Sequence, residues 1–157
     1  MKKISFMLLV ILFIMTGCSS APPKVTTLQR SQMRTQTLDA EYKVTFKSAM
    51  IVLENQGYTI ENTDMESGLI KAIVAKDATT GFAKAFGAYG VITYNVSCTV
   101  SKASEESTRI RFNIRKEEDR QQGMYSMKEA EEIDDPVIYN SLFNDLKLEI
   151  ERMKAIS

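Results

Sequence analysis

Apolar and polar residues alternate most regularly over residues 91–102 and 108–116. A period of two is typical of β-strands that are buried on one face. Weaker alternation predicts further strands over residues 32–38, 58–63 and 69–76. The two clearest strands set an apolar face of Ile92, Tyr94, Val96, Cys98, Val100, Ile110, Phe112 and Ile114 against a polar face of Thr93, Asn95, Ser97, Thr99, Ser101, Arg109, Arg111, Asn113 and Arg115. Such a sheet packs on one side and is solvated on the other.

Two segments, residues 40–56 and the stretch that starts at Pro136, show the 3.6-residue period of amphipathic helices. We expect Asp39 to be the N-cap of the first helix and Gly57 its left-handed C-cap. Asp135 is the expected N-cap of the second helix, and proline is well suited to a first helical turn. The apolar stripes of the two helices are Tyr42, Phe46, Ala49, Met50 and Leu53, and then Tyr139, Leu142, Phe143, Leu146, Ile150 and Met153.

The predicted order of elements is therefore β-α-β-β-β-β-α. Two apolar helix stripes and one apolar sheet face can all be buried when both helices lie on the same side of the sheet. We predict an α+β fold, a two-layer sandwich in which an antiparallel sheet carries two helices on one face.

Residues 1–18 have the pattern of a secretory leader. Lys2 and Lys3 are followed by residues 4–15, which are apolar except for Ser5. This run is shorter than the roughly 20 residues that a membrane-spanning helix needs, and it fits the core of a signal peptide. The junction Thr16-Gly17-Cys18 resembles the lipobox of bacterial lipoproteins. That resemblance implies cleavage after Gly17 and a diacylglyceryl thioether on Cys18.

The leader defines the predicted organisation of the chain. Residues 1–17 are expected to be a lipoprotein signal peptide, residues 18–30 a lipidated tether with two adjacent prolines, and residues 31–157 a single domain. The resemblance implies a lipid-anchored location in the cell envelope. Ser19 follows the cysteine, which by the same resemblance favours the periplasmic side of the outer membrane in a Gram-negative source.

Residues 32–76 carry a second resemblance. The segments Gln32-Met33-Arg34-Thr35, Leu53-Glu54-Asn55-Gln56-Gly57-Tyr58 and Gly68-Leu69-Ile70 are similar to those of small bacterial lipoproteins of unknown activity. More distantly, this part of the chain resembles the repeated domains of BamC, the lipoprotein accessory of the outer-membrane β-barrel assembly machine. The likeness implies a helix-grip fold, also called TATA-binding-protein-like, and it assigns no catalytic residue.

Composition narrows the classes of function. The chain has 20 basic and 20 acidic residues, so it lacks the overall positive field of a nucleic-acid-binding protein. It contains no histidine, which removes the commonest general base and the commonest metal ligand. Cys98 lies on the predicted apolar face and is expected to be a small buried hydrophobe. We therefore expect no catalytic activity, cofactor, metal or nucleic-acid partner.

Arg109, Arg111 and Arg115 form a row on the predicted polar sheet face. The row is either an ordinary solvated face or a docking surface for an acidic partner or anionic headgroups, since arginine pairs with carboxylate and phosphate. Residues 117–135 hold eight acidic residues against two basic ones. This acidic segment is expected either to fold over the arginine row or to remain solvated.

Residues 81–90 contain three glycines and three aromatic residues, and they lack the period-two pattern of their neighbours. Phe82, Phe86 and Tyr89 stand at i, i+4 and i+7, so one short helical stretch would align them. We expect either a link whose aromatic side chains pack at the edge of the core, or a mobile aromatic tip that contacts membrane or a partner.

These patterns lead to one functional hypothesis and one alternative. The first is a membrane-anchored envelope lipoprotein whose domain is a non-enzymatic accessory or scaffold for another envelope component, such as a protein partner. The alternative is a module that holds a small apolar molecule in a groove between sheet and helices, with Tyr94 and Phe112 in its lining.

Overall fold

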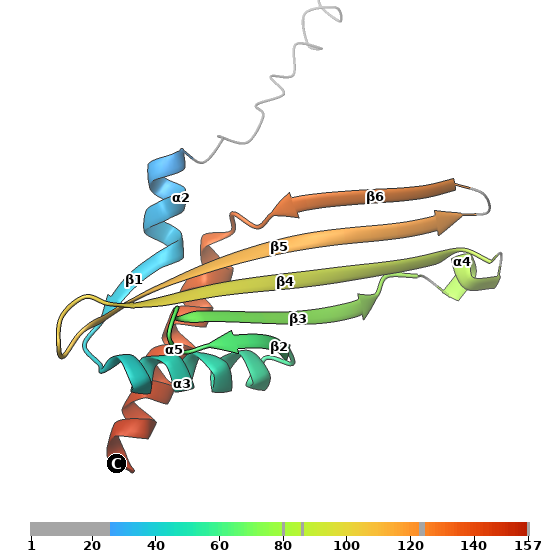
Figure 1. Cartoon of the computed structure of the whole chain (residues 1–157). Helices are drawn as coiled ribbons and strands as arrows, with labels where there is room; N and C mark the ends of the chain where they lie inside the picture. The colour runs from blue at the N-terminus through green and yellow to red at the C-terminus, as the bar shows by residue number, and fades with distance from the viewer. Residues whose placement is uncertain (1–25, 80, 86, 123–124, 157) are drawn as a thin grey trace, which may run out of the picture.

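The computed structural model describes residues 26–79, 81–85, 87–122 and 125–156. Within these residues, six strands form one antiparallel sheet in the order β1-β5-β4-β3-β2, and β6 also pairs with β5 (Figure 1). The strands are β1 (Thr35–Leu38), β2 (Thr59–Asp64), β3 (Leu69–Asp77), β4 (Tyr89–Lys102), β5 (Thr108–Gln122) and β6 (Tyr125–Glu132). The helices are α2 (Thr27–Arg34), α3 (Tyr42–Asn55), α4 (Gly81–Ala85) and α5 (Pro136–Ala155).

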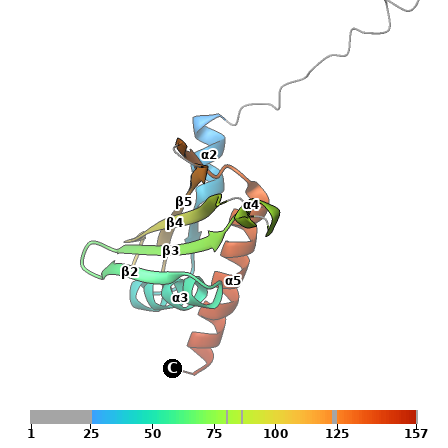
Figure 2. The same ribbon diagram turned by 90° about the vertical axis from the view of Figure 1, so that its right-hand side faces the viewer.

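The sheet and the two long helices form two layers. Figures 1 and 2 show α3 and α5 on the same face of the sheet, and α2 at the edge of the sheet beside β1 and β5. The core lies between the layers, where Val96, Cys98, Phe112, Leu53 and Leu146 are almost completely buried. The predicted two-layer α+β sandwich is confirmed. The predicted order β-α-β-β-β-β-α is followed by β1, α3, β2, β3, β4, β5 and α5, and the structure adds α2, α4 and β6.

Gly57 ends α3 as predicted. Its φ angle is +86°, which glycine adopts without the strain that a side chain would cause. The backbone N–H of Tyr58 then donates to the carbonyl of Leu53 over 3.0 Å, which satisfies a helix-terminal carbonyl. The other end differs from the prediction, because α3 begins at Tyr42 with Glu41 as a backbone cap, so Asp39 is not the N-cap.

The start of α5 is also as predicted. Pro136 occupies the first turn, and the carboxylate of Asp135 accepts a hydrogen bond of 2.8 Å from the backbone N–H of Val137. An N–H in the first turn has no acceptor within the helix, so the missing N–H of proline costs no hydrogen bond there. The cap therefore fixes where the chain leaves the sheet and enters the helical layer.

The predicted strand over residues 32–38 is wrong in its first three residues. Residues 32–34 belong to α2, and only Thr35–Leu38 form a strand. Thr26 and Gln29 form a reciprocal capping box at the start of α2, which favours helix over extended chain. α2 also takes in residues 27–30, the last part of the predicted tether.

The sheet extends further than predicted in one direction. β5 continues to Gln122 instead of ending at residue 116, and β6 returns alongside it with all eight residues exposed. We call residues 73–77, 89–95, 115–122 and β6 the arm, and the rest of the sheet the near half. Figure 1 shows the arm extending past α3 and α5, so these helices leave it largely uncovered.

Candidate functional site

The polar sheet face is the surface opposite α3 and α5. The register of β4 with β5 places Arg109 opposite Ser101, Arg111 opposite Thr99 and Arg115 opposite Asn95. Directly paired residues project on the same side of a sheet, so the predicted arginine row lies on this face beside hydroxyl and amide side chains. Lys71 of β3 pairs with Ser97 and joins the same face.

The basic side chains of this face are exposed and weakly paired. Among the residues that the structure describes, none forms an ion pair with Lys71, Arg109 or Arg111. Arg115 lies 3.8 Å from a carboxylate oxygen of Glu117, with 57% of its side chain exposed. An exposed pair at that distance contributes little to stability. The positive charge of the near half of this face is therefore largely available to an external anion.

The acidic segment neither covers the arginine row nor remains a loop. Residues 117–122 complete β5 and residues 125–132 form β6. Most of its charges are satisfied within the arm, where Glu118 pairs with both Lys116 and Arg120, and Asp119 lies 3.2 Å from Lys128. Of the two predicted arrangements, the segment therefore stays solvated and does not cover the arginine row, and it does so as a charged hairpin that lengthens the sheet.

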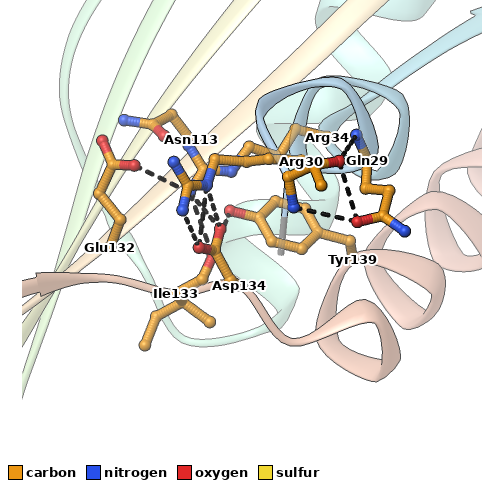
Figure 3. A network of polar contacts seen from close by, with 9 residues as sticks. Gln29, Arg30, Arg34, Asn113, Glu132, Ile133, Asp134 and Tyr139 are labelled. Atoms are coloured by element: carbon orange, nitrogen blue, oxygen red, sulfur yellow. Dashed lines mark hydrogen bonds and ion pairs between the residues drawn. The ribbon is translucent and has the colours of Figure 1, made fainter. Parts of the chain in front are cut away.

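A buried arginine network lies at the edge of β5, between the start of β1 and the end of β6 (Figure 3). Arg34 is only 2% exposed. Its Nη1 donates to Oδ1 of Asn113 over 2.6 Å, and its Nη2 donates to Oδ1 of Asp134 over 2.7 Å. The same Nη2 donates to Oε2 of Glu132 over 3.0 Å, and Nε of Arg30 donates to both oxygens of Asp134 over 2.9 Å. The network fastens α2 to the sheet.

Tyr139 completes this network from α5. Its ring lies below the guanidinium of Arg34, with 5.9 Å from Cζ to the ring centroid. Its hydroxyl donates to the carbonyl of Ile133 over 3.0 Å and accepts the N–H of Ile114 over 3.3 Å. Tyr139 therefore satisfies a backbone donor of β5 at the point where neither β1 nor β6 supplies a strand partner.

The electrostatics of the network agree with its geometry. The hydrogen bond from Arg30, reinforced by that from Arg34, holds the pKa of the Asp134 carboxyl below its ordinary value. Burial raises the pKa of the Tyr139 hydroxyl, which stays neutral. One carboxylate thus serves two guanidinium groups, an arrangement that orders α2 and contains no nucleophile.

Sequence reasoning missed this network. Arg30 and Arg34 are separated by four residues, which puts them on one helix face once α2 is recognised. The Thr26 and Gln29 capping box was the local signal for that helix. No local signal identifies Asp134 as their partner, because it lies 100 residues from Arg34.

Only part of the aromatic segment, residues 81–90, lies within the described residues. Gly81–Ala85 form the short helix α4, and Lys84 makes an ion pair with Asp77. This contact, followed by the backbone N–H of Thr79, lowers the pKa of Asp77 to about 2. The side chain of Phe82 and the whole of Phe86 lie outside the described residues. Tyr89 is 59% exposed and belongs to β4, where it pairs with Gln121, so residues 89 and 90 are strand and the predicted break is shorter.

Cys98 is completely buried, as predicted, and burial raises the pKa of its thiol well above the ordinary value. Cys18 lies outside the described residues. In the expected apolar groove, Phe112 is fully buried and its ring packs edge-on against Phe143 at 5.4 Å between centroids. Tyr94 is only half-buried against the core, with Lys76 over its ring. The centre of the expected groove is thus occupied by side chains of the protein.

Metal ligation and membrane crossing can be assessed over the part of the chain that the structure describes. There, no three histidine, cysteine, aspartate or glutamate side chains are grouped so that they could hold a metal ion. In that same part, no helix has the length and apolar character to cross a membrane. No protein-family model and no curated protein matches this sequence.

Proposed function

We propose that this chain is a membrane-anchored bacterial envelope lipoprotein whose folded domain acts as a non-enzymatic accessory or scaffold for another envelope component. One observation carries the proposal: a basic start, an apolar run of about a dozen residues and the Thr16-Gly17-Cys18 junction follow one another without interruption. In a Gram-negative source, Ser19 favours the periplasmic side of the outer membrane.

The described domain supports an accessory role over catalysis. Its interior is filled by apolar side chains, and its buried polar network joins secondary-structure elements to one another. Its exposed polar sheet face offers basic groups, of which Lys71, Arg109 and Arg111 have no ion-pair partner among the described residues. The filled space around Phe112 and Phe143 gives the alternative, a small apolar ligand between the layers, less support.

The anchor is tested by mass spectrometry of the membrane fraction. We expect the mature chain to begin at a diacylglyceryl-modified Cys18, and the matched variant Cys18→Ser to lack the lipid and remain unprocessed. A mature soluble chain that begins at another residue would refute the anchor.

The scaffold role is tested by cross-linking in cells followed by purification in detergent. A photo-reactive residue in place of Met127, which is 61% exposed on the arm, should give one discrete cross-linked envelope protein. The same group in place of Leu148, 71% exposed on α5, is the control for random collision. Equal, diffuse cross-linking at both positions would contradict a specific partner on the arm.

A further inference from the structure

We infer that the polar sheet face is a docking surface for an anionic phospholipid bilayer, which Lys71, Arg109, Arg111 and Arg115 contact at the level of the headgroups. The inference rests on the lipid anchor of the proposed function and goes beyond it, because it fixes which side of the domain faces the membrane. α3 and α5 would then face away from the bilayer.

The position of α2 gives the first reason. α2 stands at the β5 edge of the sheet, where Arg34 contacts Asn113 of the polar face, and the described chain begins at the outer end of α2 with Thr26 (Figures 1 and 2). Residues 19–26 are the eight residues (26 − 18) between Cys18 and α2. Fully extended, they span at most about 28 Å, so a lipid on Cys18 holds this side of the domain near the bilayer.

The distribution of charge gives the second reason. On the near half of the face, Lys71, Arg109 and Arg111 are exposed without an ion-pair partner among the described residues, and their strand neighbours are Ser97, Ser101 and Thr99. On the arm, by contrast, the basic side chains of Lys116, Arg120 and Lys128 all have carboxylate partners. Guanidinium and ammonium groups that lack an internal partner are free to bind phosphate.

Two exposed side chains flank the basic face. Leu28, 68% exposed, lies on the first turn of α2, and Tyr89, 59% exposed, lies at the far end of the same sheet face. Tyrosine favours the headgroup region because its ring is apolar and its hydroxyl is polar. Among the described residues of the face between them, no large apolar side chain is exposed, which suits contact with headgroups rather than insertion.

The orientation can be measured on the full lipidated chain reconstituted into vesicles. One set contains phosphatidylcholine alone, and the other contains about 30% phosphatidylglycerol, an anionic lipid. A fluorescent thiol probe is attached at Thr99→Cys on the polar face or at Glu54→Cys on α3, both exposed positions. The native Cys98 does not compete for the probe because it is buried.

We expect the Thr99 probe to be protected from an aqueous quencher on the anionic vesicles and exposed on the neutral ones, and the Glu54 probe to be exposed on both. High salt should remove the protection, since about 1 M salt reduces the Debye length to about 3 Å. Each basic group near an anionic surface contributes about fivefold, so Arg109→Gln with Arg111→Gln should lower the protected-to-exposed ratio about 25-fold. The matched control, Lys43→Gln with Lys47→Gln on α3, removes the same charge and should leave the protected-to-exposed ratio of the Thr99 probe unchanged.

Three results would overturn the inference. If the chain is retained on the vesicles but the Thr99 probe stays exposed on anionic lipid, the face does not meet the bilayer and is free for an acidic protein. If the α3 pair lowers protection as much as the arginine pair, the effect is only one of net charge. If a high-salt wash releases the chain from both vesicles, the lipid anchor itself fails and the orientation fails with it.

Discussion

The near half of the sheet and the arm share strands β3, β4 and β5, yet they are held together by different forces. In the near half, Phe112, Phe143 and Leu146 are completely buried between the layers. In the arm, every residue of β6 is exposed, and β6 is held to β5 by backbone pairs and by ion pairs such as that between Asp119 and Lys128. The comparison shows that a strand can be specified by its neighbour alone, without an apolar face of its own.

The energetic scale of the two regions differs accordingly. Burial of a large apolar side chain contributes about 1.5–3 kcal/mol, whereas an exposed ion pair contributes about 0–1 kcal/mol. We therefore expect the near half to determine the stability of the domain. Substitutions in the arm should change its surface and leave its fold intact.

Of these substitutions, Leu146→Ala in the near half should lower the free energy of unfolding most. Leu146 is fully buried on α5, so truncation leaves a cavity and should lower the free energy of unfolding by about 2–5 kcal/mol in chemical denaturation. Leu148→Ala is the matched control on the same helix, because Leu148 is 71% exposed. Equal small effects at both positions would mean that α5 does not pack on the sheet.

Asp134→Asn tests the polar network at the boundary between the regions. The change keeps the shape of the side chain and removes the charge that Arg30 and Arg34 share. Hydrogen bonds to charged groups are the stronger ones, so we expect a loss of about 1–3 kcal/mol in the free energy of unfolding at pH 7.

The pH dependence of the same variant identifies the cause of this loss. Because the folded-state pKa of Asp134 is lowered, its contribution is complete above its ordinary pKa of 3.8 and is lost as pH falls through the folded-state value. The difference in free energy of unfolding between wild type and Asp134→Asn should therefore shrink in acid. An advantage that persists unchanged under strong acid would exclude the carboxylate charge as its source.

Asp119→Asn should give the smallest effect. Asp119 lies 3.2 Å from Lys128 across the β5–β6 pair, and both side chains are exposed. We expect the free energy of unfolding to fall by less than about 1 kcal/mol, and by less still in high salt. A loss as large as that of Asp134→Asn would show that the arm is coupled to the core.

The same contrast explains which strands could be predicted from the sequence. The near half of β4 and β5 carries apolar residues at every second position, and this period predicts its buried face. β6 reads Tyr-Ser-Met-Lys-Glu-Ala-Glu-Glu and has no buried face, so periodicity gives no signal for it. Its strand conformation depends on pairing with β5, which is a property of the hairpin and not of the segment.

The candidate site divides in the same way. The arginine row was predicted from alternation, because position parity alone places Arg109, Arg111 and Arg115 on one face. The network around Arg34 was not predicted. The alternation of Met33, Thr35 and Thr37 predicts a strand there, whereas Arg34 is the last residue of helix α2. Its charge partners come from the far end of the sequence, and only the folded chain brings them together.

The partners of α2 and β1 also set an order of events during synthesis. β1 pairs with the first residues of β5, at least 70 positions later, and the partner of Arg34, Asp134, lies 100 positions later. The β2–β3 hairpin has its partner close by in the sequence and can form as soon as it emerges, whereas α3 packs mainly on α5, which is synthesised last. α2 and β1 therefore leave the ribosome before the rest of the domain but are among the last elements to form their tertiary contacts.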